Sequence, residues 1–216
     1  MFSHFPAPAG AFELRRKIMR KLDVRIADSG DKEMLTDIIT AGFIADPITR
    51  WVWPDLHAYL AMMPEFISAF GGRAFDHDSA YLMPDGNAAA LWLPPGVDPD
   101  AEAIMGLFQT SVSGDKLAEV EDFFEQMDAY HPADQACWYL PMIATEPAST
   151  GMGLGSAILA HALRRCDQDG TITYLESSNP RNIPLYERFG FEAIGVIQAG
   201  SSPPMYPMIR PARPTA

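Results

Sequence analysis

The sequence predicts an α/β (α+β) fold in which helices flank a mixed central sheet of about six to seven strands. Strand-like and helical segments alternate along the chain. The strongest example is the apolar run Cys137 to Thr145, which is followed by a glycine-rich turn and then by a helical pattern. Residues 81–93 add a hairpin. Hydrophobic residues make up 48% of the 216 positions, enough for a sizeable core.

Composition bounds the architecture and the class of protein. We expect one domain over residues 23–212, preceded by an N-terminal arm over residues 1–22. No apolar run reaches the roughly 18 residues needed to span a membrane, and the arm lacks the apolar segment of a secretion signal. The formal charge of −12 disfavours nucleic-acid binding and suits a cationic or neutral substrate. Cys137 and Cys166 have no metal-binding spacing, so we predict buried thiols, no metal site and a cytoplasmic protein.

The first third of the chain predicts a strand, a helix and a second helix. Residues 24–26 form the strand, and the polar residues 28–31 cap a helix that runs to about Phe43. This helix should end before Pro47, because proline disfavours the helical conformation in the residue that precedes it. After a connecting segment, the second helix ends near Phe70.

The middle third predicts a hairpin and a helical insertion. Residues 81–83 and 88–93 flank Pro84-Asp85-Gly86-Asn87, which is a strong turn signal. Residues 98–130 then form helices inserted before the strand at 137–145. Acidic residues of this insertion are expected on a solvated face. They are Asp115, Glu119, Glu121, Asp122, Glu125 and Asp128.

The last third predicts the remaining strands. A strand at 172–177 follows the helix after the glycine turn. A short helix around Tyr186 leads to a strand at 191–197, and the last strand spans 205–210.

The turn has the chemistry of an anion site. Gly151, Gly153 and Gly155 let backbone N–H groups approach a ligand closely, and the helix that follows directs its positive dipole end to the same point. A phosphate or pyrophosphate is the expected ligand. Ser156-Ala157 replaces the Lys-Ser/Thr pair of a P-loop, and the glycine spacing matches a dinucleotide-binding fingerprint poorly. The structural alternative is a turn whose glycines only permit tight strand–helix packing.

The turn and the segment after it resemble the GCN5-related N-acetyltransferase (GNAT) superfamily. The family's cofactor turn, (Gln/Arg)-x-x-Gly-x-(Gly/Ala), is matched at its glycine positions by residues 150–155. Further matches are Asn179, Leu185-Tyr186 and Gly190-Phe191. The resemblance extends from about Trp138 to Ile197. Thr150 stands where the family usually has Gln or Arg, which removes a long polar contact to the cofactor.

The resemblance implies a GNAT fold and an N-acetyltransferase. Acetyl would pass from acetyl-CoA to an amine of a small molecule by direct attack in a ternary complex. Two parallel strands would splay apart, with Pro141 at the point where pairing loosens, and Tyr186 would be the acid that protonates the leaving thiolate. The implied cofactor-binding residues are Ile143, Ala144, Thr145, Thr150, Gly151, Met152, Gly153, Leu154, Gly155, Ser156, Asn179 and Asn182.

The acceptor side is less defined. The region around Trp51 and Trp53 walls the acceptor site in the family, so both indoles are candidates for substrate contact, with core packing as the alternative. Asp46 is first a helix cap and second a ligand for the substrate amine.

The general base is not apparent from the sequence. The strand at 137–145 contains no carboxylate, and Glu146 beside the turn is better explained as structural. His131, Asp134 and Asp46 remain candidates.

Two other classes of protein stay open at this point. One is a non-catalytic acyl-CoA-binding or regulatory module, and the other is a dinucleotide-dependent oxidoreductase. The acceptor and the length of the acyl group are also open, and a homodimer is compatible with the sequence.

Overall fold

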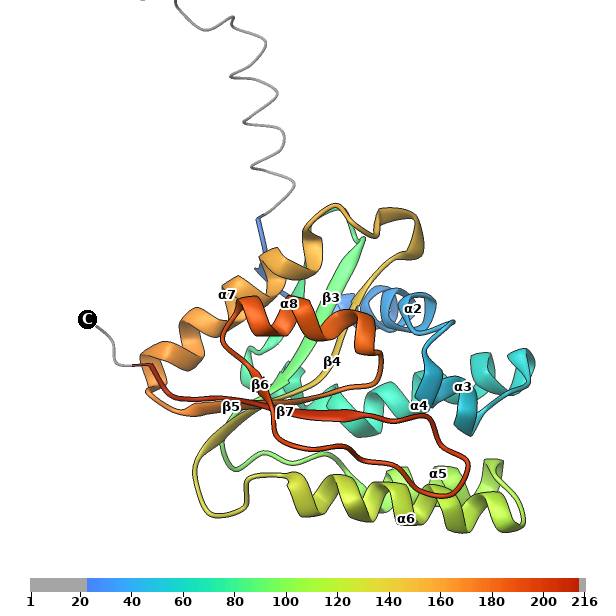
Figure 1. Ribbon diagram of the computed structural model, residues 1–216. Coiled ribbons are helices and arrows are strands. Elements are labelled where there is room, and N and C mark those ends of the chain that lie inside the picture. The colour runs from blue at the N-terminus through green and yellow to red at the C-terminus, as the bar shows by residue number, and fades with distance from the viewer. Residues whose placement is uncertain (1–22, 214–216) are drawn as a thin grey trace, which may run out of the picture.

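The computed structural model describes residues 23–213 (Figure 1). The predicted N-terminal arm, residues 1–22, lies outside this range. Seven strands form one sheet in the order β1-β2-β3-β4-β5-β7-β6. The strands are β1 (Arg25–Ile26), β2 (Ala80–Leu82), β3 (Ala88–Leu93), β4 (Cys137–Thr145), β5 (Ile172–Ser177), β6 (Glu192–Ala193) and β7 (Tyr206–Arg210). The predicted mixed sheet is confirmed.

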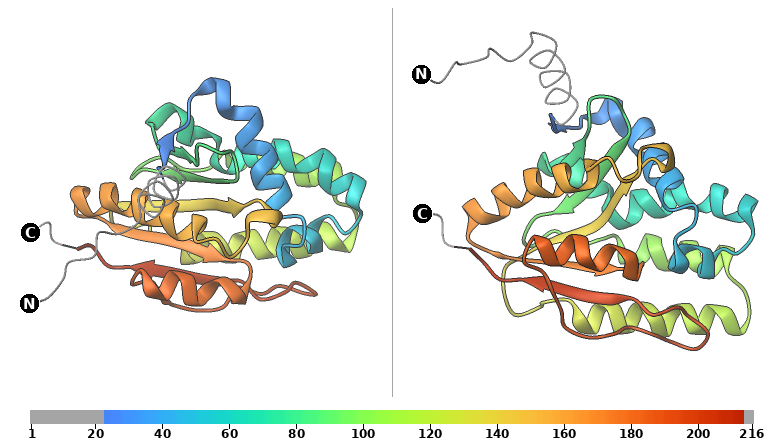
Figure 2. Two further views of the ribbon diagram at one scale, coloured as in Figure 1. Left: turned by 90° about the horizontal axis from the view of Figure 1, so that it is seen from above. Right: turned by 45° about the horizontal axis from the view of Figure 1, so that its top comes forward.

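The helices cover both faces of the sheet (Figures 1 and 2). On one face α7 (Leu154–Asp169) and α8 (Ile183–Arg188) pack against a hydrophobic cluster that includes Trp92 and Trp138. The other face carries a larger cluster with α2, α3, α4, α5 and α6. Their bounds are α2 (Lys32–Gly42), α3 (Pro47–Val52), α4 (Leu56–Gly71), α5 (Ala101–Ser111) and α6 (Asp115–Tyr130). The predicted helical insertion before β4 is thus α5 and α6.

Aspartate side chains fix the starts of the helices on this second face. Asp46 accepts hydrogen bonds of 3.0 Å from two amides in the first turn of α3, and Pro47 follows as its first helical residue. Asp55 and Asp100 cap α4 and α5 in the same way. Each such cap contributes about 1 kcal/mol. Helix α3 is absent from the sequence prediction, although these start signals are visible in it.

The sheet is mostly antiparallel, but β4 and β5 are parallel. Their pairing begins at Cys137↔Ile172 and ends at Leu140↔Leu175, although both strands continue. Pro141 follows the last pair on β4, and it has no N–H with which to extend the ladder. The edge of β4 that faces β5 is therefore unpaired from Pro141 onward, and the two strands diverge there.

One predicted strand is shorter than expected. The segment 191–197 forms only β6 (Glu192–Ala193) and an isolated bridge between Ile197 and Met205. It lies at the outer edge of the sheet, where β7 is its one neighbour among the strands of residues 23–213. Within the described range, no helix combines the length and the apolar character needed to cross a bilayer.

Candidate functional site

A cavity of about 510 Å³ occupies the gap between β4 and β5. One half is lined by the second part of β4, by the glycine turn and by α8. The other half is lined by apolar side chains from α3, α4, α5 and α6. The cavity therefore connects the predicted anion site with the larger hydrophobic cluster.

The glycine turn has the geometry of an anion cradle. Gly151 and Gly153 both have φ +80°, a left-handed conformation that side chains rarely adopt. A Cβ atom built on either residue would meet no heavy atom within 4 Å, so the space in front of the turn is open. Gly153 is the N-cap of α7, and no side chain caps this helix end. The first amides of a 16-residue helix thus face open space, where a phosphate fits.

Most of the predicted cofactor-binding residues line this cavity. They are Ile143, Ala144, Thr145, Thr150, Gly151, Gly153, Leu154, Gly155, Ser156, Asn179 and Asn182. Met152 does not belong to the lining, and the residue is 51% exposed to solvent. The Asn179 side-chain oxygen accepts a 3.1 Å hydrogen bond from the Arg181 amide, so its NH₂ group is the part free to donate to a ligand.

Tyr186 lies on α8 and lines the cavity between the turn and the diverging strands. The residue is buried, and burial raises the pKa of its phenol above the ordinary value. The negative charge of Asp46 acts in the same direction. The phenol is therefore protonated at physiological pH and is available as a hydrogen-bond donor.

Asp46 connects the two sides of the cavity. Besides capping α3, its carboxylate accepts a short hydrogen bond from the Ser178 hydroxyl, which follows β5. Burial raises the pKa of Asp46, and the hydrogen bonds to Ser178 and to the α3 amides oppose this effect. With these contacts to protein groups, Asp46 holds α3 against the end of β5.

The two predicted tryptophans lie in different places. Trp53 lines the cavity, and its indole N–H donates a 3.0 Å hydrogen bond to Ser111. Trp51 is not part of the lining. Its ring packs 5.5 Å from Phe123, and the Lys116 ammonium lies 3.4 Å above the Trp51 ring centre.

Glu176 is the site residue that the sequence reasoning missed. It lies on β5 directly after Leu175, the last residue paired with β4, and it lines the cavity. The Tyr139 hydroxyl donates a 2.8 Å hydrogen bond to it. Burial raises the pKa of Glu176 to about 7, although the hydrogen bond from Tyr139 lowers it. Glu176 is the one charged residue of a mostly buried strand, and this was the signal that could have identified it.

The earlier candidates for a base are placed less favourably. His131 lies against the rings of Tyr139 and Tyr174, at 4.9 and 5.1 Å, and burial lowers the pKa of its imidazole. His131, Asp134 and Glu146 do not line the cavity. Glu176 and Asp46 are its carboxylates within residues 23–213.

Comparison with known proteins finds similarity to one family. The sequence model of the Acetyltransferase (GNAT) family matches residues 122–191, a span that includes β4, the cradle, β5 and Tyr186. The crystal structure of "histone acetyltransferase HPA2 and related acetyltransferase" from Corynebacterium glutamicum is similar, with a TM-score of 0.61 and 25% identity. The similarity covers 89% of this chain and 98% of that one. The chain is thus similar to GNAT acetyltransferases, in sequence over residues 122–191 and in fold over most of its length.

Two further comparisons also find N-acetyltransferases. An uncharacterized N-acetyltransferase from Schizosaccharomyces pombe is 28% identical over 135 residues, which are 56% of this chain and 55% of that protein. The chain thus spans about half the length of this curated relative. A polyamine N-acetyltransferase from Drosophila melanogaster, which forms N-acetylagmatine, shares the fold with a TM-score of 0.60 and 13% identity over 87% of this chain and 98% of that one.

The GNAT match also has a clear limit within the site. It ends before β7 and begins in α6, so the elements α2 to α5 lie outside it. The helices that supply Trp53, Phe66 and Phe108 to the cavity are among them. The family match therefore covers the cofactor half of the cavity, and most of the other half has to be interpreted from its own residues.

Proposed function

We propose that this chain is an N-acetyltransferase that transfers acetyl from acetyl-CoA to the amine of a small molecule by direct attack in a ternary complex. The observation that carries the proposal is a single cavity that joins an open amide cradle to a buried carboxylate. Acetyl-CoA would supply the activated acyl group. The amides from Gly151 to Ser156 would hold its pyrophosphate, and the unpaired edge of β4 would hold its pantetheine arm.

Glu176 is the proposed general base. A primary amine with a pKa near 10.4 is protonated at pH 7 and cannot attack until it loses a proton. The pKa of Glu176, at about 7, is closer to the pKa of the amine than the value of 4.5 of an ordinary glutamate. The difference in pKa between amine and base falls from about 6 to about 3 units. The free-energy cost of the proton transfer falls with it, from roughly 8 to roughly 5 kcal/mol. Burial of the ammonium beside apolar walls lowers the pKa of the amine and narrows the gap further.

Tyr186 is the proposed general acid. As the new N–C bond forms and the C–S bond breaks, the phenol donates its proton to the departing sulfur. The nitrogen loses a second proton as the amide forms, and this proton restores the Tyr186 phenol. The first proton, which Glu176 removed from the ammonium, is released to solvent, so the cycle closes with amide, CoA thiol and one proton. The raised pKa of Tyr186 keeps the proton on the phenol until the sulfur acquires negative charge. Asn179, whose NH₂ group is free to donate, would contact the pantetheine arm.

The test is release of CoA thiol from acetyl-CoA in the presence of a panel of amines. The proposal expects release that depends on the amine, with kcat/KM reduced roughly 10²–10⁴-fold in Glu176→Gln. Glu192→Gln, which changes an exposed carboxylate on β6, serves as the matched control and should keep wild-type rates.

Three results would refute the proposal or its parts. Protection against melting by acetyl-CoA without turnover of any amine would favour the non-catalytic acyl-CoA-binding module. Protection by NAD(P) but not by acetyl-CoA would favour the oxidoreductase. Equal loss of activity in both glutamine variants would remove Glu176 from the role of base.

A further inference from the structure

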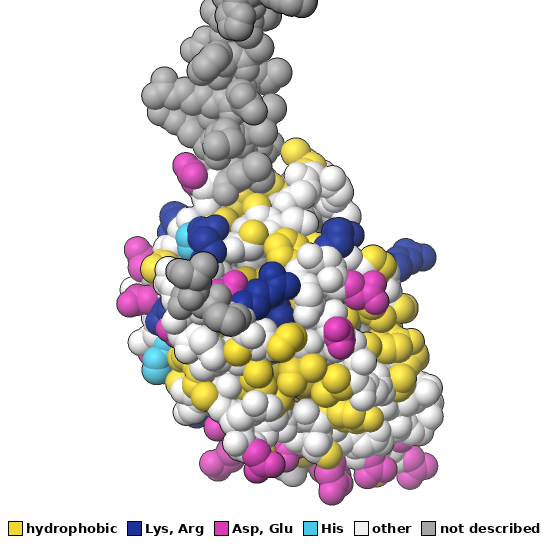
Figure 3. Space-filling view, turned by 60° about the vertical axis from the view of Figure 1, so that its left-hand side comes forward, with side chains coloured by type: hydrophobic (Ala, Val, Ile, Leu, Met, Phe, Trp, Pro, Cys, Tyr) yellow, Lys and Arg dark blue, Asp and Glu magenta, His cyan; other side chains and the backbone are white. Residues whose placement is uncertain are grey.

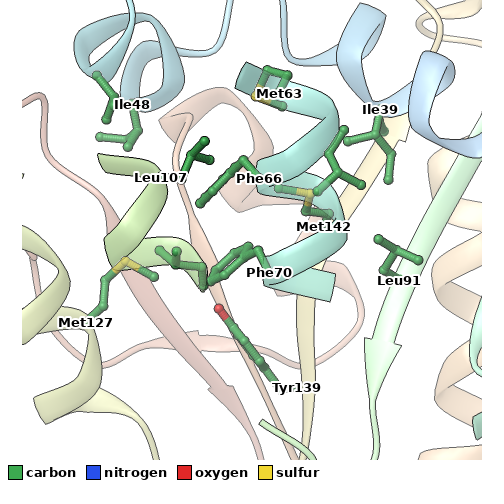
Figure 4. Packing of buried hydrophobic residues seen from close by; sticks show 14 of the residues in the cluster. Ile39, Ile48, Met63, Phe66, Phe70, Leu91, Leu107, Met127, Tyr139 and Met142 are labelled. Atoms are coloured by element: carbon green, nitrogen blue, oxygen red, sulfur yellow. The ribbon is translucent and has the colours of Figure 1, made fainter. Parts of the chain in front are cut away.

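The half of the cavity that lies away from the cradle is closed by its own walls. Four of its lining phenylalanines are at most 8% exposed: Phe66, Phe70, Phe108 and Phe123. Phe66 stacks on Phe70 with 5.1 Å between the ring centres, and Figure 4 shows both rings among the other apolar side chains of the cluster. An acceptor can therefore reach Glu176 from this side only if one of the walls moves.

One wall segment has little apolar anchoring. It is the loop of residues 198–204, which we call the strap, and its base is the isolated bridge between Ile197 and Met205. Met205 lines the cavity. Figure 1 shows this loop in dark red, between β6 and β7, running beside α6. Of residues 198–204, only Ala199 belongs to the larger hydrophobic cluster, and an alanine buries little apolar area.

Polar side chains of α6 hold the strap at both ends. At the base, Gln126 donates a 3.1 Å hydrogen bond to the Gln198 carbonyl and accepts one of 3.3 Å from the Gln198 amide. At the tip, the Ser201 hydroxyl donates a 2.6 Å hydrogen bond to Glu119. Glu119 precedes Gln126 by seven residues, so both lie on one side of α6. Other acidic side chains gather along the lower edge of the molecule in Figure 3, at the level where Figure 1 places α6. The exposed acidic residues of this helix are Asp115, Asp122, Glu125 and Asp128.

Trp51 connects the tip of the strap to α3. Its indole N–H donates a 3.1 Å hydrogen bond to the Ser201 hydroxyl. The Lys116 ammonium lies 3.4 Å above the Trp51 ring centre and 3.8 Å from the Glu119 carboxylate. These four side chains form a closed ring of contacts, which we call the latch. The Trp51 ring also packs against Phe123, which lines the cavity, so the latch lies directly outside the cavity wall.

The latch holds the strap only weakly. Its two hydrogen bonds are exposed to solvent, where water competes for the same groups, and salt screens the ion pair between Lys116 and Glu119. The strap also has hydrogen bonds of its own. The Ser202 amide donates to the Ala199 carbonyl at 2.9 Å, and the Ala199 amide donates to the Ser202 hydroxyl at 3.0 Å. The strap can therefore leave α6 as one folded unit.

We propose that the strap is a gate to the acceptor half of the cavity and that the latch keeps this gate closed. The strap swings about the bridge between Ile197 and Met205 and uncovers the junction of α3 and α6 at Phe123. The acceptor then enters toward Glu176 while acetyl-CoA fills the open cofactor half. Separate routes let the second substrate enter after the first has bound. The inference rests on the proposed acetyltransferase function.

A disulfide across the latch tests the gate. A Cβ atom built on Gly200 lies 2.5 Å from the Glu119 Cγ, so the two Cβ positions are at most about 4 Å apart, within the range of a disulfide. The variant is Glu119→Cys/Gly200→Cys, and the natural Cys137 and Cys166 are buried. The left-handed φ of +51° at residue 200 strains the oxidised and reduced forms alike, so their comparison isolates the effect of the disulfide.

The readout is the acetylated product of the amine that the wild type uses fastest, measured by chromatography because a reductant disturbs thiol assays. The oxidised form should lose at least about tenfold in kcat/KM for the amine and regain it on reduction, while its Kd for acetyl-CoA changes less than about twofold. Glu119→Cys alone, treated with the same oxidant, is the control and should keep its untreated rate. Equal rates in the oxidised and reduced forms, or loss of acetyl-CoA binding on oxidation, would overturn the gate.

Hydrogen exchange tests the latch without catalysis. Ser201→Ala removes both hydrogen bonds of the latch hydroxyl, so the Gln198 amide at the base of the strap should exchange at least about fivefold faster than in the wild type. Ser113→Ala changes an exposed serine between α5 and α6 and should exchange like the wild type. Unchanged exchange in Ser201→Ala would overturn the latch. Faster exchange in a protein whose wild type acetylates no amine would refute the acetyltransferase proposal, and the acceptor gate with it.

Discussion

Replacing Glu176 by glutamine removes a carboxylate that burial holds at a pKa of about 7, against 4.5 for an ordinary glutamate. A group whose pKa is raised by folding stabilises the fold fully below its unfolded pKa. That contribution is lost as the pH rises toward the folded value. For Glu176 the loss therefore falls between about pH 4.5 and pH 7.

The size of the effect follows from the shift. The pKa shift of about 2.5 units, at 1.36 kcal/mol per unit, gives an upper bound of about 3 kcal/mol for the stability lost above pH 8. The same two pKa values give a loss of less than about 1 kcal/mol at pH 5. Glu176→Gln has no charge to bury, and the Tyr139 hydroxyl can still donate to its side-chain oxygen. The variant should therefore be more stable than the wild type above pH 8, by up to about 3 kcal/mol, and similar to it at pH 5.

The assay is urea unfolding of both proteins at pH 5.0 and pH 8.5, read as the difference in free energy of unfolding at each pH. Other titrating groups cancel in this difference, because they are common to both proteins. At pH 8.5 the extra stability of Glu176→Gln corresponds to a melting temperature roughly 6–12 °C higher than that of the wild type, for a chain of this size. The claim that burial raises the pKa of Glu176 would be refuted if the difference in free energy of unfolding were the same at both pH values. It would also be refuted if the wild type were the more stable protein at pH 8.5.

Three further predictions concern the cavity. Tyr186→Phe should lower kcat at least about tenfold and leave acetyl-CoA binding by calorimetry unchanged, and an unchanged kcat would remove Tyr186 from the role of acid. Gly153→Val should abolish acetyl-CoA binding by filling the open space before the cradle. Gly96→Val, at a similar φ of +81° and also with nothing within 4 Å, should show the same backbone strain and bind normally, so equal binding by both would reject the cradle. Tyr139→Phe removes a hydrogen-bond donor to Glu176 and should shift the acid limb of the pH–kcat/KM profile to higher pH by roughly one unit or more. An acid limb at the wild-type pH would show that this hydrogen bond does not act on Glu176.

Local patterns predicted most of the fold. The strands β4 and β5 and the helix α7 were predictable because an apolar run, a glycine turn and a helical repeat each leave a strong signal over many residues. The six-residue helix α3 was missed because it is too short to show a repeat. The strand at 191–197 was overestimated, because its sequence does not reveal that it lies at the sheet edge.

The sequence predicted only those residues of the candidate site that belong to a recognisable motif. The cradle glycines, Asn179 and Tyr186 lie in matched motifs, and the structure places them around one cavity. Glu176 depends on register, because its position at the divergence follows from the Leu140↔Leu175 pair, which the sequence does not show.

The acceptor side has no motif of its own. Trp51 and Trp53 are two residues apart at the end of α3, and only one of them faces the cavity. The direction of each indole is decided by packing against α6 and α5, which the sequence could not reveal.

The central claim is that open backbone amides of the turn bind the phosphates of the acyl carrier. The most direct measurement is the shift of the amide NMR signals of Gly151, Gly153 and Gly155 during titration with CoA and, separately, with pantetheine, which lacks the phosphates. We predict large downfield shifts with CoA and small ones with pantetheine, because a hydrogen bond to a phosphate deshields the amide proton. Signals that do not move with CoA, or that move equally with both ligands, would contradict the claim.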